Sequence, residues 1–116
     1  MYNPGTHIIA TLASEKTQLL DTYSAFKMRT DELIIKFDLK RLGEVYHDYT
    51  PAGYTAVVCL SESHISIHTW PEYNTLNMDI YLSNYERSND STVEKIYEAY
   101  VDFFSAAVVN FQTIVR

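Results

Sequence analysis

Apolar and polar residues follow two different periods along this 116-residue chain. Period two is typical of a strand with one buried face, and it is clearest at Leu76, Met78, Ile80 and Leu82. This pattern predicts a strand over residues 76–82. Apolar, β-branched or alternating runs predict further strands at residues 7–12, 44–49, 54 to about 69 and 107–115.

Apolar residues at helical spacing predict three helices. The first begins near Ser14 and runs through residues 18–20. The second begins at Thr30, a residue type that caps helix N-termini, and ends at Gly43, a residue type common just after a helix. The third begins in the polar segment 88–91 and carries an apolar stripe over three turns, made of Val93, Ile96, Tyr97, Tyr100, Val101 and Phe104.

Helices that alternate with strands joined by short links predict an α+β fold. We expect a two-layer sandwich, in which helices cover one face of an antiparallel sheet. No linker, repeat or low-complexity segment interrupts the chain, so residues 1–116 are expected to form a single domain. A sheet face without helices needs a partner in so small a protein, and we therefore predict a homodimer.

Composition narrows the function classes. A hydrophobic content of 47% with 14% aromatic residues excludes a disordered chain. The net charge of −6 argues against nucleic-acid binding, which needs Lys and Arg to replace counterions, and mildly favours a cationic ligand. The single cysteine, Cys59, excludes an internal disulfide or a Cys-rich zinc site and favours a reducing compartment. Without a signal-peptide pattern or a run of about 20 apolar residues, we expect a cytoplasmic protein that does not bind membranes.

Residues 60–72 carry the candidate chemistry. The segment has the apolar content of a strand, yet it contains Glu62, Ser63, His64 and His68. Polar side chains on a buried strand cost free energy unless each has a partner, so we interpret the segment as a site built on a sheet. His64 and His68 would share one face of a strand at roughly 13 Å, too far apart to bind one metal ion, and no metal is expected.

This segment resembles the self-processing segment of the small prokaryotic S-adenosylmethionine decarboxylases. The similarity lies in Glu-Ser-His at residues 62–64, followed by His-Thr-Trp-Pro-Glu at residues 68–72. Residues 5–10 resemble the opening strand of the family, residues 51–53 resemble its turn before the processing strand, and residues 79–81 resemble a later strand. The resemblance covers most of the chain and is weakest at residues 14–42 and at the C-terminus.

The resemblance implies a self-made cofactor. In the family, the serine matching Ser63 attacks the carbonyl of the residue before it, the chain breaks between the positions of Glu62 and Ser63, and the serine becomes a pyruvoyl group. The products would be a small chain of residues 1–62 and a large chain of residues 63–116. His68 matches the processing base of the family. Thr55 stands where the family has a serine that supports processing, and it retains the hydroxyl group.

Three further positions match residues that contact the substrate. Glu72 matches the acid that holds the ribose hydroxyls of S-adenosylmethionine, and Tyr49 matches an aromatic residue that stacks on the adenine. Ser83 stands where the family has the cysteine acid that returns a proton to the α-carbon. A thiol has a pKa of about 8.5 and an alcohol is a much weaker acid. Cys59 is not expected to replace that acid, because an unbroken strand would place it roughly 13 Å from Ser63 and pointing into the packed side.

Three interpretations follow. The first is a pyruvoyl-dependent decarboxylase of S-adenosylmethionine that serves polyamine (spermidine) synthesis. The second is a relative that decarboxylates arginine or ornithine with a different proton donor. The third is a non-catalytic relative that is never cleaved, in which Ser63, Tyr49 and Glu72 are ordinary strand, core and loop residues. Glu62, Ser63 and His68 favour an enzyme, and the changes at Thr55 and Ser83 favour the third interpretation.

Overall fold

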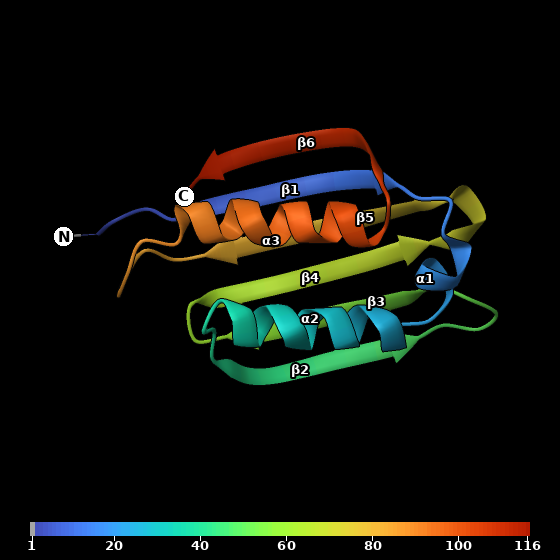
Figure 1. Ribbon diagram of the computed structural model, residues 1–116, viewed down its shortest axis with the longest axis horizontal. Helices are drawn as coiled ribbons and strands as arrows, with labels where there is room; N and C mark the ends of the chain where they lie inside the picture. Colours follow the sequence, from blue (N-terminus) through green and yellow to red (C-terminus); the bar gives the residue numbers. More distant parts are fainter. Residues whose placement is uncertain (1) are drawn as a thin grey trace.

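The computed structural model describes residues 2–116, which fold around one six-stranded antiparallel sheet with the strand order β2–β3–β4–β5–β1–β6. The predicted α+β class is confirmed, because α2 and α3 lie side by side over the same face of this sheet (Figure 1). The strands are β1 (Thr6–Ala13), β2 (Arg41–Asp48), β3 (Tyr54–Leu60), β4 (Ser63–Trp70), β5 (Thr75–Leu82) and β6 (Ala107–Val115). The helices are α1 (Thr17–Asp21), α2 (Ser24–Lys36) and α3 (Asp90–Phe103), and a 3-10 turn, η1, spans Pro71–Tyr73.

The core lies between the sheet and the two long helices. Strand alternation turns one set of side chains toward the helices, and in β3 these are Tyr54, Ala56, Val58 and Leu60, all buried. The helices meet through aromatic rings, with Phe26 of α2 stacked on Tyr100 of α3 at 5.2 Å between ring centroids. Burial of this apolar surface provides the main driving force for folding.

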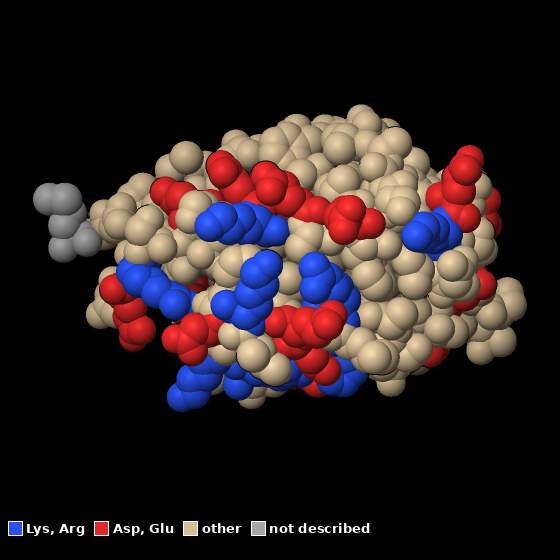
Figure 2. All heavy atoms as spheres, in the orientation of Figure 1, with Lys and Arg blue, Asp and Glu red and all other residues tan. Residues whose placement is uncertain are grey.

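The outer surface of the helical layer is charged. Figure 2 shows Lys and Arg side chains interspersed with Asp and Glu over α2 and α3. These side chains include Lys27, Arg29, Asp31 and Glu32 of α2 and Glu94, Lys95, Glu98 and Asp102 of α3. A surface of closely mixed charges is typical of a face exposed to solvent, so the outer side of the helices is a poor candidate for a protein interface.

The opposite face of the sheet, called the open face here, is covered by no helix or strand within residues 2–116. Its apolar residues include Val45 and Val57, which are 67% and 45% exposed. All four histidines of the chain, His7, His47, His64 and His68, lie on strand positions of this face. Among the described residues, no helix is both long enough and apolar enough to span a membrane.

The prediction of one strand from residue 54 to about 69 was wrong. The chain reverses at Ser61 and Glu62, so that β3 and β4 form a hairpin in which Leu60 lies opposite Ser63. The turn is stabilised from outside the hairpin, since the Ser61 N–H donates to the Lys40 carbonyl at 2.9 Å. Buried positions change from even numbers before the turn to odd numbers after it, which one continuous strand does not allow.

The second predicted helix was also placed wrongly. Helix α2 begins at Ser24, so Thr30 lies in its middle, where the hydroxyl is buried against the Tyr100 hydroxyl at 2.7 Å. Gly43 lies inside β2, which begins at Arg41, and α1 begins at Thr17 rather than near Ser14. The predicted strands at residues 7–12, 76–82 and 107–115 and the helix start within residues 88–91 are confirmed.

Candidate active site

Backbone strain marks the start of β4. Ser63, the first residue of the strand, has a φ of 139°, a region that residues with a side chain rarely adopt. Such a conformation persists only where the surrounding structure enforces it, and it is often found at functional sites. The strained residue is the one whose hydroxyl would attack the preceding peptide bond.

The carbonyl of that peptide bond has a specific partner. The oxygen of Glu62 accepts a 2.7 Å hydrogen bond from the backbone N–H of Ser83, which directly follows β5. This contact arises because β4 pairs with β5 and Ser63 lies opposite Leu82. A donor fixed on a carbonyl oxygen stabilises the negative charge that develops there when a nucleophile adds to the carbon.

Gly5 allows the chain before β1 to approach this region closely. A Cβ atom at this position would lie 2.4 Å from the Leu82 carbonyl oxygen and 3.0 Å from the Cα of Ser83. Neither of these is a flexible side-chain atom that could move away. The small residue at position 5 therefore lets the chain pass beside Ser83 without displacing it.

The side chain of Glu62 is held by Arg87 and Asn89, two residues that no sequence motif singled out. Glu62 is only 9% exposed, and its two oxygens accept hydrogen bonds from Arg87 Nε at 3.1 Å and Nη2 at 2.8 Å. The side-chain amide of Asn89 donates to Oε2 at 2.6 Å. The Arg87 guanidinium holds the pKa of the Glu62 carboxyl below its usual range, and Asn89 adds to this effect. A buried carboxylate demands such a cation, but sequence spacing does not reveal which residue provides it.

A second group of predicted residues meets at the other end of β4. Nδ1 of His68 is hydrogen-bonded to the Thr55 hydroxyl, which also lies 3.1 Å from the Tyr49 hydroxyl. The Trp70 ring packs at 4.4 Å from the His68 ring between centroids. Tyr49, His68, Trp70 and Glu72 line a cavity of about 420 Å³. The structure thus brings together Tyr49, Thr55, His68 and Glu72.

The two groups are far apart within one chain. Ser63 and His68 lie on the same extended strand, and five residues at about 3.3 Å each separate them by about 16 Å. Glu62, Ser63 and Ser83 therefore form one group, and Tyr49, Thr55, His68 and Glu72 form another. His68 cannot reach the Ser63 of its own chain.

Cys59 does not lie where a single strand over residues 54–69 predicts. The hairpin places Cys59 opposite His64 and next to Leu60, the pairing partner of Ser63, and its side chain is exposed on the open face. The expected long separation and inward orientation were both wrong, because both assumed an unbroken strand. The thiol lies close to the Ser63 end of the sheet.

The open face near Ser63 carries a connected polar cluster. The Arg116 guanidinium can only donate, so Nδ1 of His7 accepts its hydrogen bond at 2.9 Å and Nε2–H of His7 donates to Asp79 at 2.8 Å. The His64 ring lies 5.9 Å from the His7 ring. Burial lowers the pKa of His64, and the neighbouring His7 contributes in the same direction.

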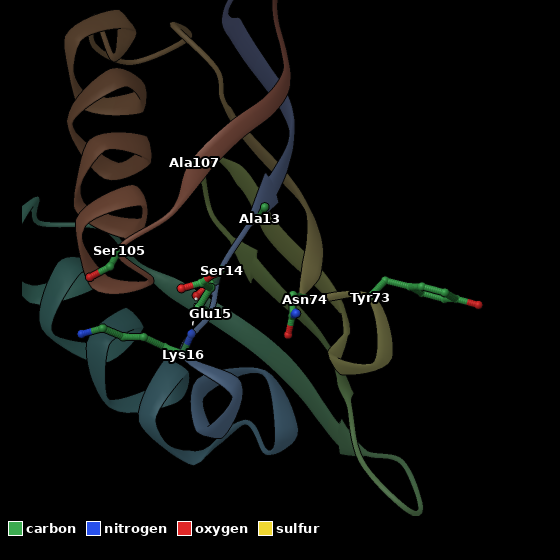
Figure 3. Close-up of a pocket in the computed structure, with 8 residues that line it drawn as sticks. All are labelled: Ala13, Ser14, Glu15, Lys16, Tyr73, Asn74, Ser105 and Ala107. Carbon is green, nitrogen blue, oxygen red and sulfur yellow. Dashed lines mark hydrogen bonds between the residues drawn. The ribbon is translucent and has the colours of Figure 1, made fainter.

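A larger cavity, of about 540 Å³, is lined by residues that belong to neither group. It is lined by Ala13, Ser14, Glu15, Lys16, Tyr73, Asn74, Ser105 and Ala107 (Figure 3). Figure 3 shows the Tyr73 ring directed away from the other labelled residues. The Ser14 hydroxyl is already engaged, donating to the Phe104 carbonyl at 2.6 Å. This cavity contains none of the predicted site residues, and no set of three or more His, Cys, Asp or Glu residues among those described could hold a metal ion.

Comparison with known proteins agrees with the resemblance noted in the sequence. The family model described as S-adenosylmethionine decarboxylase matches residues 6–116. The S-adenosylmethionine decarboxylase proenzyme of Archaeoglobus fulgidus is 37% identical over 100 residues, which is 86% of this chain and 86% of the relative. That of Picrophilus torridus is 32% identical over 103 residues, which is 85% of this chain and 79% of the relative.

A solved structure supports the fold. The adenosylmethionine decarboxylase from Aquifex aeolicus superimposes with a TM-score of 0.80 at 24% sequence identity. The match covers 100% of this chain and 91% of that chain. At this identity the likeness bears on architecture alone, and it agrees with the α+β sandwich described above.

Proposed function

The chain belongs to the S-adenosylmethionine decarboxylase family, and we propose that it cleaves itself between Glu62 and Ser63 and then decarboxylates S-adenosylmethionine. The observation that carries this proposal is the strained Ser63 beside a Glu62 carbonyl that is held by the Ser83 N–H. The product would be the aminopropyl donor for spermidine synthesis.

Self-cleavage follows from the chemistry of the Ser63 side chain. The Ser63 hydroxyl oxygen adds to the Glu62 carbonyl carbon and loses its proton to a base, while negative charge develops on the oxygen that faces the Ser83 N–H. The C–N bond then breaks, the Ser63 nitrogen takes up a proton, and an ester joins Glu62 to the Ser63 oxygen. Removal of the Ser63 α-proton expels the main-chain carboxylate of Glu62, which becomes the C-terminus of the small chain, and leaves dehydroalanine. Dehydroalanine adds water and releases ammonia to give the pyruvoyl group.

The surroundings of residue 63 fit a pyruvoyl group. The group replaces Ser63 without adding bulk, and Ser83 beside it lines a cavity of about 430 Å³ with Tyr2, Asn3 and Tyr85. The pyruvoyl carbonyl supplies an electron sink for the electron pair that remains when the substrate carboxylate leaves as CO2. We propose that the Ser83 side chain returns a proton to the substrate, with a hydroxyl that is a weaker acid than the thiol at the matching position in the family.

The distance between Ser63 and His68 favours a site shared by two chains. We propose a homodimer in which two open faces pack together with their β4 strands running in opposite directions. A two-fold axis then brings the partner's His68 to the end of the sheet that carries Ser63, and it brings His68 of this chain to the same end of the partner's sheet. The same packing covers Val45 and Val57.

Substrate binding is proposed for the group around His68. Tyr49 offers an aromatic face for the adenine, and Glu72 offers a carboxylate for the ribose hydroxyls beside the same cavity. In the proposed dimer this cavity lies beside residue 63 of the partner. The cationic sulfonium of the substrate is compatible with the net charge of −6.

Mass spectrometry of the purified protein tests cleavage and cofactor formation together. We expect two fragments that divide between residues 62 and 63, with a pyruvoyl group at the start of the larger one, and we expect Ser63→Ala to remain intact. Release of CO2 should then be measured with S-adenosylmethionine, arginine and ornithine. Intact protein after long incubation would contradict the proposal. Release of CO2 from arginine or ornithine, but not from S-adenosylmethionine, would show that the enzyme acts on a different substrate.

A further inference from the structure

We propose that Arg87 and Asn89 are positioning residues for self-cleavage, which hold the Glu62 side chain so that the peptide bond between Glu62 and Ser63 keeps its reactive geometry. This inference rests on the proposed function and concerns residues outside the motif at residues 60–72. The Glu62 carboxylate, the Arg87 guanidinium and the Asn89 amide are called the Glu62 clamp below.

Arg87 connects three segments that meet at the cleavage turn. Two of its nitrogens bind the two oxygens of Glu62, and Nη2 also donates to the carbonyls of Phe37 at 3.3 Å and Asp38 at 3.0 Å. The turn at Ser61 and Glu62 is thereby attached to the end of α2 and to the segment before α3. A single guanidinium therefore holds the Glu62 side chain, which takes no part in the backbone hydrogen bonds of the hairpin.

Asn89 links the Glu62 side chain to the residue that holds the Glu62 carbonyl. One hydrogen of its amide goes to Glu62 Oε2 at 2.6 Å and the other to the Ser83 carbonyl at 2.8 Å. Since both partners only accept, the orientation of the amide is determined. Ser83 in turn donates its N–H to the Glu62 carbonyl, so hydrogen bonds join the three residues in a closed ring beside the bond to be cut.

Asn89 is itself held firmly. It is 1% exposed, and its backbone N–H donates to Asn84 Oδ1 at 2.7 Å. The Asn84 amide donates to the Pro4 carbonyl at 2.9 Å and to Asp90 Oδ1 at 3.0 Å, and the Thr6 hydroxyl donates to the same Asp90 oxygen at 2.7 Å. The clamp is thus anchored to α3 and to the start of β1 rather than to a free loop.

The clamp accounts for the strain at Ser63. A two-residue turn closed only by β3 and β4 could relax Ser63 toward an ordinary extended conformation. Charge-assisted hydrogen bonds to a buried carboxylate are strong and directional, so they can hold Glu62 and with it the positive φ of Ser63. Lys40 is the other cation that lines the cavity beside Glu62 and Arg87, and it forms no ion pair with Glu62, so Arg87 is the cation that holds the carboxylate.

The test measures the rate of self-cleavage in freshly synthesised protein. Full-length wild type, Arg87→Ala, Arg87→Lys, Asn89→Ala and Glu62→Gln are made by cell-free translation, and cleavage is followed over time by intact-mass spectrometry. Arg29→Ala is the matched control, because Arg29 is paired only with Glu32 on the surface of α2. We expect Arg87→Ala to cleave about tenfold more slowly or worse, Arg87→Lys to be intermediate, and the control to equal wild type.

Chemical rescue separates positioning from a general loss of structure. Guanidinium chloride at low concentration should raise the cleavage rate of Arg87→Ala severalfold and leave wild type unchanged. Combining Glu62→Gln with Arg87→Ala should slow cleavage no further than the slower single change, because both remove the same contact. A misfolded variant would show neither behaviour, and its thermal unfolding would reveal it.

The outcomes distinguish this inference from the proposed function. If wild type cleaves and Arg87→Ala cleaves equally fast, the clamp proposal is overturned and the proposed function stands. Slow cleavage of Arg87→Ala that guanidinium does not relieve, with additive effects in the double variant, would likewise overturn it. If wild type never cleaves, both proposals fail together.

Discussion

The backbone N–H of Ser83 donates a 2.7 Å hydrogen bond to the carbonyl oxygen of Glu62. We therefore expect one residue to serve the proposed self-cleavage through its main chain and the proposed decarboxylation through its side chain. The two roles are separable, because a substitution at position 83 changes the acid and leaves the N–H in place.

The change Ser83→Cys should therefore increase the release of CO2 from S-adenosylmethionine without altering self-cleavage. A positioned acid contributes roughly 10²–10⁴-fold to a rate, which sets the scale of the possible gain. Cleavage is followed by mass spectrometry and turnover by trapped CO2. Ser83→Ala is the control, which should cleave itself but show no increase in CO2 release. Equal and rapid turnover of wild type and Ser83→Cys would show that another group supplies the proton.

Gly5→Ala should destabilise the protein and slow cleavage. The added methyl group would lie 2.4 Å from the Leu82 carbonyl oxygen, so the segment that carries Ser83 must move. Overpacking of this kind costs about 1–3 kcal/mol, measurable by urea unfolding. Gly43→Ala is the matched control, since no heavy atom beyond its two chain neighbours lies within 4 Å of the corresponding position. Similar effects of the two changes would argue against a special role for the approach at Gly5.

Mixed dimers should reveal whether two chains share one site. Neither Ser63→Ala nor His68→Ala should cleave alone. When the two variants are synthesised together, the intact His68 of the first chain can act on the intact Ser63 of the second, so only the His68→Ala chain should be cut. Mass spectrometry separates the products if one chain carries a tag. No cleavage in the mixture would mean that His68 does not act across a dimer.

The open face should be the dimer interface. A specific interface typically buries on the order of 1,600 Å², and Val57 lies within the surface available for it. Val57→Glu should shift the sedimentation mass from two protomers to one while the circular dichroism spectrum is retained. Ile35→Glu, on the helical side and 81% exposed, should leave the dimer unchanged. A wild-type mass of one protomer at micromolar concentration would exclude the assembly.

The Glu62 clamp should make stability depend on pH. Because Arg87 holds the pKa of Glu62 below its usual range, the folded protein favours the ionised form. The resulting stability is fully present above the unfolded pKa of about 4.3 and is lost as the pH falls through the lower folded value. In the uncleaved Ser63→Ala background, Arg87→Ala should reduce stability at pH 7, and the difference from the parent should shrink as the pH falls below the unfolded pKa. A constant difference between the two proteins would contradict this linkage.

The sequence alone determined the elements with strong local patterns and the family. Leu76, Met78, Ile80 and Leu82 alternate without exception, and β5 lies where they predict it. The apolar stripe of α3 and the β-branched content of β6 were equally informative. The motif at residues 62–72 indicated the family because it depends on residue identity and spacing along the chain.

Tertiary structure decided what depends on distant neighbours. Residues on both sides of the turn at Ser61 and Glu62 have strand character, and the change from even to odd buried positions that marks the turn is seen only in the structure. Thr30 has the character of a helix cap, yet a Tyr100 hydroxyl from another helix offers it a buried partner instead. Long-range packing overrides local preference in such cases.

The candidate site shows the same division. The residue types at positions 62, 63 and 68 are evident in the sequence, but the separation of Ser63 from His68 follows from the extended geometry of β4. Arg87 and Asn89 belong to no recognisable sequence motif and directly precede α3, and only folding brings them to Glu62. Chemistry is encoded locally in residue types, whereas hydrogen bonds between distant segments depend on the sheet register that the whole chain establishes.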